Sequence, residues 1–193
     1  GQGGPIDYES ALLYYSKLPN NAGALNNLGV MYASGEGVEA DQEKANEYYK
    51  KAAERGSTMG MKNLADRYLS GASGEVDIAA AIEWYKKSFK AGRRESGIKL
   101  GDIYYEGSHV DEDIDAAIEY YESAIRIKPK KGGKQDIDEY VKVVVKLADI
   151  YYEGDKVEMD DSKANELYHI AAEYCNLYAY HRLGIQYYHG YGV

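Results

Sequence analysis

The feature that most constrains this chain is a short motif that recurs five times along its 193 residues. Each copy has a leucine, a tyrosine four residues later and a glycine after three more. The copies are Leu28–Gly35, Leu64–Gly71, Leu100–Gly107, Leu147–Gly154 and Leu183–Gly190. Their tyrosines are 36 residues apart, except for one step of 47, so a single insertion of 11 residues interrupts the period. Self-similarity at such a period is typical of a solenoid, in which each repeat buries its apolar face against its neighbours.

Each repeat is predicted to be a pair of helices. In the first complete repeat we expect helix A over residues 22–33, a turn over 34–38 and helix B over 41–54. Leu28 and Tyr32 share one face of helix A, and Gly29 permits a close approach of helix B. The motif glycines are expected to end helix A in a left-handed cap. Helix B is expected to begin at an aspartate N-cap, namely Asp41, Asp77, Asp113 and Asp160 in successive repeats.

The period predicts one all-α solenoid over residues 5–193, and residues 1–4 look like a linker or a cloning remnant. It divides into a half repeat (5–21), four repeats (22–57, 58–93, 94–140 and 141–176) and a second half repeat (177–193). We expect the half repeats to leave apolar side chains open, which would suit further repeats of the same kind in a larger array. These side chains include Leu12, Leu13, Leu183 and Tyr187.

Two segments depart from the pattern. The turn of the second repeat ends at Gly74 without the usual valine. The insertion contains a lysine-rich loop over residues 128–135, followed by Asp136 and Glu139, whose spacing predicts a capping box that opens a helix from about residue 137 to 152. The loop is either a tolerated insertion or a contact for anionic lipid or an acidic partner.

Composition restricts the partners. The net charge of −9 argues against nucleic acid, which needs clustered Lys and Arg. One cysteine permits no intrachain disulfide, and no apolar run is long enough to span a membrane. Membrane contact is therefore expected only through a partner or the lysine-rich loop. The cytoplasm is the favoured compartment, while a periplasmic or secreted location stays open.

Residues Leu28–Gly56 read L-G-x-x-Y-x-x-G-x-G-V-x-x-D-x-x-K-A-x-x-Y-Y-x-K-A-A-x-x-G, which resembles a Sel1-like repeat, a relative of the tetratricopeptide repeat. The resemblance implies a right-handed α-solenoid of antiparallel helix pairs that acts as an adaptor or scaffold, with helix A on its concave side. The chain departs from this pattern at Gly74, in the inserted loop and at Cys175, which stands where earlier repeats have Gly56 and Gly92.

On this basis the candidate partner-binding surface is the face of helix A opposite its buried leucine and tyrosine. Asparagine amides there would hold a peptide main chain, cations would meet carboxylates, and tyrosines would act as anchors. Alternatively the face neutralises itself, with Lys99 paired to Glu95 or Asp102, and Lys146 to Asp149. The candidate residues are Asn27, Asn63, Asp66, Lys99, Asp102, Tyr105, Lys146, Asp149, Tyr152, Arg182 and Tyr188.

We therefore predict a non-catalytic protein- or peptide-binding adaptor that assembles a signalling, quality-control or membrane-associated complex. Two alternatives are a secreted or surface bacterial factor that binds host protein or glycan, and a regulatory part of an enzyme. No catalytic, cofactor or metal site is expected. His181 and His189 lie about 12 Å apart along one helix, too far for one metal ion. Cys175 follows a helix C-terminus, which disfavours a thiolate.

Overall fold

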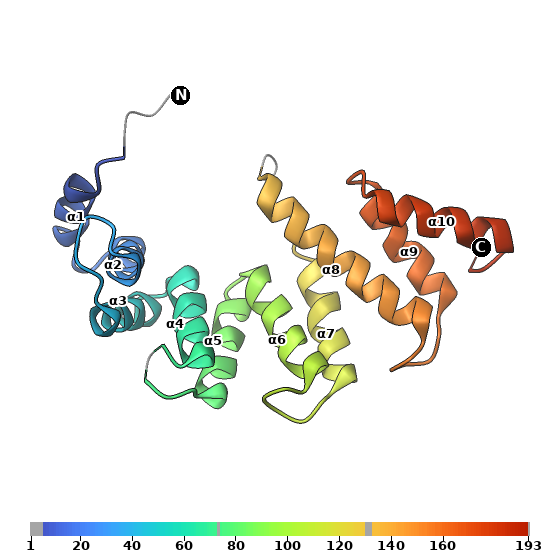
Figure 1. Ribbon diagram of the computed structural model, residues 1–193, viewed down its shortest axis with the longest axis horizontal. Helices are drawn as coiled ribbons and strands as arrows, with labels where there is room; N and C mark the ends of the chain where they lie inside the picture. Colours follow the sequence, from blue (N-terminus) through green and yellow to red (C-terminus); the bar gives the residue numbers. More distant parts are fainter. Residues whose placement is uncertain (1–5, 73, 130–132, 193) are drawn as a thin grey trace. The chain divides into compact units, whose positions relative to one another are not determined.

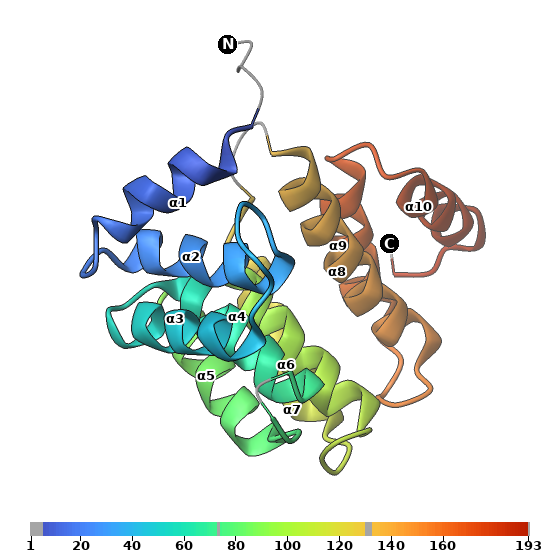
Figure 2. The same cartoon turned by 60° about the vertical axis from the view of Figure 1, so that its left-hand side comes forward.

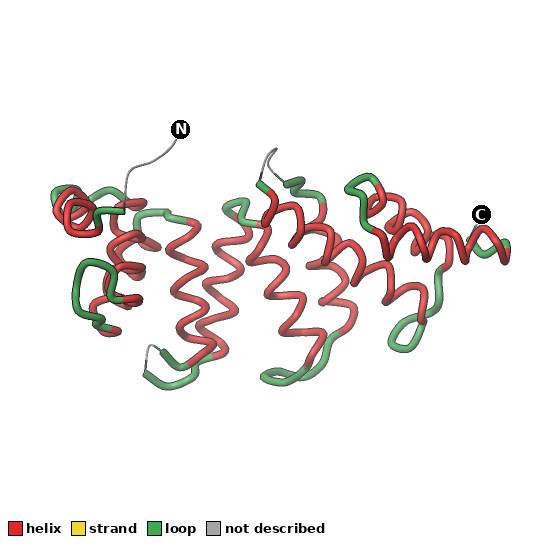
Figure 3. The backbone as a smooth tube through the Cα atoms, turned by 45° about the horizontal axis from the view of Figure 1, so that its top comes forward, coloured by secondary structure: helices red, strands yellow, loops and turns green. Residues whose placement is uncertain are grey.

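The structure, a computed structural model, describes residues 6–72, 74–129 and 133–192. Within these ranges it contains ten α-helices and no strand (Figure 3). The chain divides into two compact units, an N-terminal unit (Gly1–Ser96) and a C-terminal unit (Gly97–Val193), with the boundary inside α6. The predicted all-α fold class is confirmed.

The N-terminal unit is built from consecutive helices that pack in sequence order, α1 on α2, α2 on α3, α3 on α4 and α4 on α5 (Figures 1 and 2). Its core includes Ala45, Tyr49, Ala53 and Leu64. The helices are α1 (Tyr8–Ser16), α2 (Ala22–Ser34), α3 (Gln42–Glu54), α4 (Thr58–Ser70), α5 (Ile78–Lys90) and the first residues of α6 (Arg94–Glu106).

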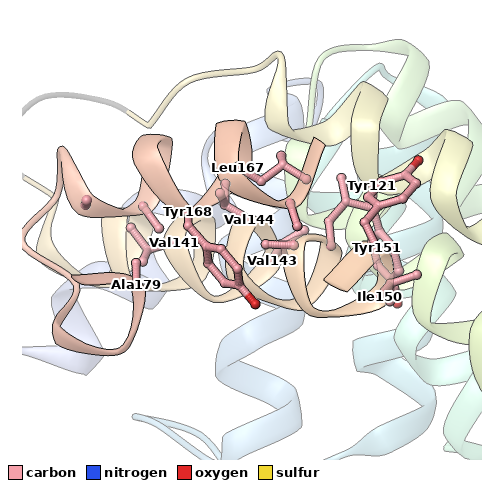
Figure 4. Close-up of a cluster of buried hydrophobic side chains, with 14 of the residues drawn as sticks. Tyr121, Val141, Val143, Val144, Ile150, Tyr151, Leu167, Tyr168 and Ala179 are labelled. Carbon is pink, nitrogen blue, oxygen red and sulfur yellow. The ribbon is translucent and has the colours of Figure 1, made fainter. Parts of the chain in front are cut away.

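The C-terminal unit packs α7 on α8, α8 on α9 and α9 on α10. Its buried cluster is centred on α8 and includes Val144 together with Tyr121 and Tyr168 (Figure 4). Leu147 belongs to the same cluster. The helices are the remainder of α6, α7 (Ile114–Ile125), α8 (Lys134–Glu153), α9 (Asp161–Ala172) and α10 (Leu177–His189).

Both predicted helix signals are confirmed. The carboxylates of Asp41, Asp77, Asp113 and Asp160 each accept a hydrogen bond from the backbone N–H three residues later, at 2.8 to 2.9 Å. The five motif glycines have φ between 60° and 76°, the left-handed conformation that glycine adopts without a steric cost. Turn chemistry therefore fixes where α3, α5, α7 and α9 begin and where α2, α4, α6, α8 and α10 end.

The predicted capping box at the insertion is wrong. Helix α8 begins at Lys134, its N-cap is Gly133, and no side chain caps it. Asp136 is already inside the first turn, because Lys134 and Gln135 are good helix formers that continue the helix toward its N-terminus. Within the predicted loop, Lys128 Nζ donates to Tyr140 Oη at 2.7 Å, so this lysine packs against α8. The neighbouring lysines 130 and 131 lie outside the described residues.

The unusual turn of the second repeat is held by an arginine. Arg67 occupies the helix position that holds Met31 in the first repeat. Its Nη2 donates to Ala72 O at 2.7 Å and to Gln42 Oε1 at 2.9 Å. The side chain thereby ties α3 to the turn that lacks the usual valine.

The expectation of open apolar faces is only partly met. Leu183 is buried, with 7% of its surface exposed, because it packs into the cluster around α8, so its prediction as an open residue is wrong. Leu12 is half-buried, whereas Leu13 is exposed and Tyr187 is 56% exposed.

Candidate partner-binding face

In the N-terminal unit the predicted polar residues of helix A are engaged by other side chains of the same unit. Asn63 Nδ2 on α4 donates to Asn26 Oδ1 on α2 at 2.9 Å, and Asn27 is half-buried beside it. Asp66 accepts from Tyr85 Oη and pairs with Lys62 Nζ at 2.6 Å. Much of the hydrogen-bonding capacity predicted for a partner is therefore used inside the unit.

In the C-terminal unit we define the Lys146 cluster as Asp102, Tyr105, Tyr121 and Lys146. Asp102 Oδ1 accepts from Tyr121 Oη and from Lys146 Nζ, each at 2.8 Å. Lys146 Nζ lies 4.7 Å from the centre of the Tyr105 ring and 4.9 Å from that of Tyr121, which are cation–π distances. Lys146 of α8 therefore joins its repeat to α6 and α7 of the preceding repeat.

The same arrangement returns one repeat later in the Arg182 cluster, which consists of Asp149, Tyr152, Tyr178 and Arg182. The Arg182 guanidinium lies 4.6 Å from the Tyr152 ring centre and 5.0 Å from that of Tyr178. Arg182 Nε donates to Tyr178 Oη at 2.7 Å, and Tyr178 Oη donates to Asp149 Oδ1 at 3.0 Å. In each cluster a cation from one helix A lies on the tyrosine of the preceding helix A, close to that helix's aspartate.

A buried tyrosine of helix B supports each of these aspartates. Tyr168 Oη donates to Asp149 Oδ1 at 2.6 Å, as Tyr121 does to Asp102. Burial, reinforced by the neighbouring carboxylate, raises the pKa of Tyr121 and Tyr168 well above the usual range. These phenols stay protonated as donors and fix the carboxylates in place. The sequence alone does not indicate these bonds, because the spacing of 19 residues joins two different helices.

The ion pairs predicted within single helices are wrong, because the lysines do not pair with the predicted carboxylates. Lys146 pairs with Asp102 and not with Asp149, because the relevant neighbour is on the preceding repeat and not on its own helix. Glu95 pairs with Arg93 at 3.3 Å. Lys99 is exposed, and among the described residues no ion-pair partner is found for it.

A cavity of about 450 Å³ adjoins the Arg182 cluster, between the N-terminal half of α8 and the first turn of α10. Val141 and Val145 line it from α8, and Leu177, which is 81% exposed, lines it from α10. Lys142 and Asp138 add a charge of each sign. This part of α8 exists because of the insertion, whose residues continue into the helix.

The predicted tyrosine anchors differ in accessibility. Tyr188 is 85% exposed, whereas Tyr105 and Tyr152 are half-buried. One face of Tyr105 is also approached by Lys156, whose Nζ lies 4.4 Å from the ring centre and pairs with Glu112 at 2.6 Å. Tyr152 and Tyr188 are thus the better candidates for direct contact.

No group of three or more His, Cys, Asp or Glu side chains able to hold a metal ion occurs among the described residues. His169 Nε2 contacts Tyr187 Oη at 3.0 Å, while His181 and His189 are exposed on α10. Over the same residues, no helix is both long and apolar enough to cross a membrane.

The repeated helix pairs and the cross-repeat clusters define the class of the protein as a helical-repeat solenoid. The family model of the Sel1 repeat matches most of the chain, at residues 1–18, 22–57, 58–92, 98–126, 144–173 and 177–193. The chain belongs to the Sel1 repeat family, whose fold generally serves as a protein-interaction scaffold and is typically non-catalytic.

Similar solved structures carry the same repeat. A Sel1 repeat protein from Oxalobacter formigenes is 26% identical with a TM-score of 0.75, over 96% of this chain and 70% of that one. A protective antigen of uropathogenic Escherichia coli with an SLR fold is 31% identical with a TM-score of 0.82, over 98% of this chain but only 39% of that protein. Helicobacter pylori cysteine rich protein B is 25% identical with a TM-score of 0.51, over 71% of this chain and 99% of that one. Comparison with curated protein sequences gives no match.

Proposed function

We propose that this chain is a non-catalytic adaptor that binds a protein or peptide on the helix-A face of its C-terminal unit, between α8 and α10. The observation that carries the proposal is the Arg182 cluster beside the apolar cavity. Carboxylate contacts and stacking hold the two tyrosine rings and the guanidinium in one arrangement. Binding to such a surface orders few side chains, which lowers the entropic cost of association.

The partner would insert one apolar side chain between Val145 and Leu177 and lay its main chain along Tyr152 and Tyr188. Tyrosine suits this role because its ring is apolar and its hydroxyl can bond a peptide group. Arg182 contributes by positioning the Tyr152 ring and Lys146 by positioning the Tyr105 ring, since the charges of both cations are already engaged. Lys99 remains as the exposed cation for a partner carboxylate.

A random peptide library displayed on phage and selected against the full chain tests this proposal. The affinities of the recovered peptides are then measured for the wild type and for Tyr152→Ala and Tyr188→Ala. We expect each substitution to weaken binding about tenfold or more, the loss typical of an interfacial tyrosine anchor. Tyr14→Ala, which removes an exposed tyrosine of the N-terminal unit, is the matched control.

The assignment of this face is wrong if the peptides bind both variants as tightly as the wild type. The proposed contact between Lys99 and a partner carboxylate is tested separately with Lys99→Glu. Charge reversal at Lys146 is unsuitable, because it would also break the contact of Lys146 with Asp102. Unchanged affinity of acidic peptides for Lys99→Glu would remove Lys99 from the site.

A second candidate is a bacterial surface or secreted factor that recognises host protein or glycan. It is favoured by the likeness to the Escherichia coli protein described as a protective antigen. Binding of the full chain to immobilised host extracellular proteins and glycans, compared with Tyr188→Ala, separates this candidate from an adaptor that shows no such binding.

A further inference from the structure

An aromatic ring with a lysine over it covers one face of helix B in the first two complete repeats. Lys51 Nζ lies 5.4 Å from the Tyr48 ring centre, and Lys87 Nζ lies 4.2 Å from the Trp84 ring centre. In both pairs the aromatic residue and the lysine are the seventh and the tenth residue after the aspartate N-cap. This face of helix B is therefore covered by its own side chains in these repeats.

The fourth repeat has aliphatic residues at both positions. Leu167 of α9 stands at the aromatic position, and Ile170 stands at the lysine position. These shorter side chains leave space, and a cavity of about 490 Å³ opens beside them, between α9 and the C-terminal part of α7. Ile125 of α7 and Leu147 of α8 complete its apolar lining. We call this cavity the α7–α9 groove.

The rim of the α7–α9 groove has a surplus of positive charge. Lys163 Nζ of α9 pairs with Glu122 Oε1 of α7 at 2.5 Å, so these two charges neutralise each other. Arg126 is exposed, and among the described residues no ion-pair partner is found for it. The charged residues of the rim are Arg126, Lys128 and Lys163 against Glu122 and Glu166. In a chain with a net charge of −9, the groove is therefore a local site that favours an anionic group.

We propose that the α7–α9 groove binds an acidic segment of a partner protein. The segment inserts one apolar side chain between Leu167 and Ile170 and places the carboxylate of a neighbouring Asp or Glu on Arg126. Burial of the apolar side chain supplies most of the affinity, while the exposed guanidinium selects the carboxylate. Glu166 repels an acidic residue on the α9 side, so the carboxylate of the partner lies toward the C-terminal end of α7.

This site is separate from the proposed peptide-binding face between α8 and α10. The cavity at that face and the α7–α9 groove have no lining residue in common. The groove is lined mainly from two helices B, whereas Tyr152 and Tyr188 belong to two helices A. The chain would therefore hold two different segments, and either site can fail without the other.

The test is a selection of a random peptide library, displayed on phage, against the immobilised full chain with an excess of Leu167→Tyr in solution. This variant gives α9 the tyrosine that Tyr48 and Tyr120 supply in other repeats, so it fills the groove and leaves other faces intact. The competitor therefore removes peptides that bind any other face. Circular dichroism verifies its fold, and Ile170→Ser takes its place as competitor if it does not fold.

We expect the surviving peptides to share an aliphatic or aromatic residue next to Asp or Glu. Their affinity should fall about tenfold or more for Ile170→Ser, which removes part of the apolar lining, and about fivefold for Arg126→Glu. Added salt should weaken their binding to the wild type, because the charges are exposed. Lys86→Glu, the same charge change at an exposed lysine of α5, is the control and should bind like the wild type.

The proposal is overturned if no peptide survives the competition, or if the survivors lack an acidic residue. Survivors that bind Ile170→Ser or Arg126→Glu as tightly as the wild type overturn it as well. A parallel selection without the competitor shows whether the face between α8 and α10 binds peptides, so a failure of the groove is told apart from a failure of that face.

Discussion

Tyr121 Oη on α7 donates a hydrogen bond to Asp102 Oδ1 on α6 at 2.8 Å, and the same bond over the same spacing of 19 residues joins Tyr85 to Asp66 and Tyr168 to Asp149. The first repeat differs, because Val30 stands where the others have aspartate. Three repeats therefore contain this bond. Tyr49 is the equivalent tyrosine in the first repeat, which lacks the aspartate.

Tyr121→Phe should destabilise the C-terminal unit by about 2 kcal/mol, since it removes a buried hydrogen bond to a charged acceptor. Urea titration followed by circular dichroism measures the change. Tyr49→Phe is the control, because among the described residues no hydrogen-bond partner is found for the Tyr49 hydroxyl, and it should cost clearly less. Equal losses in the two variants would contradict the role given to the carboxylate.

The protein should lose stability steeply at alkaline pH. Burial first, and then the neighbouring aspartates, raise the pKa of Tyr85, Tyr121 and Tyr168 above the unfolded value of about 10. Above pH 10 the unfolded chain releases these protons and the folded chain keeps them, so stability present below pH 10 is lost as the pH rises. Each tyrosine contributes about 1.4 kcal/mol per pH unit.

The measurement is urea unfolding between pH 8 and 11.5 for the wild type and for Tyr121→Phe, whose stability should fall less steeply because one titrating group is gone. Tyrosinate absorbance should show the three buried phenols ionising only as the protein unfolds. If these phenols ionise near pH 10 while the protein is folded, their pKa values are not raised and the prediction is wrong.

Two glycines at equivalent positions should respond to alanine with opposite signs. Gly101→Ala places a methyl group against the Tyr121 ring and should destabilise by about 2 kcal/mol through overpacking. Gly184→Ala meets no atom within 4 Å and should stabilise α10 by up to about 1 kcal/mol through helix propensity. Thermal and urea unfolding measure the stability of both variants. A loss of stability in Gly184→Ala would show that other atoms pack against α10 at this position.

Cys175→Gly should stabilise the protein by up to about 1 kcal/mol. Cys175 has φ of 60°, and the equivalent Gly56 and Gly92 have φ of 86° and 92°. A side chain in the left-handed region carries a steric cost that glycine lacks, partly offset by the greater freedom of glycine in the unfolded chain. Cys175→Ser keeps the Cβ atom and should leave the free energy of unfolding unchanged.

The sequence by itself determined the repeat, most of the helix boundaries and the fold class. These depend on local rules: aspartate satisfies free amides at a helix start, and glycine adopts the left-handed conformation at a helix end. The predicted capping box at Asp136 does not form, because the good helix formers Lys134 and Gln135 extend the helix past it toward the N-terminus.

Only the tertiary structure decided which side chains pair across repeats. Lys146 has Asp149 nearby on its own helix, yet it bonds Asp102, 44 residues earlier, because stacking places the two helices side by side. The burial of Leu183 and the exposure of Gly184 likewise depend on which helix lies against α10. Spacing along one helix gives the direction of a side chain, but its partner is set by the packing of the next helix.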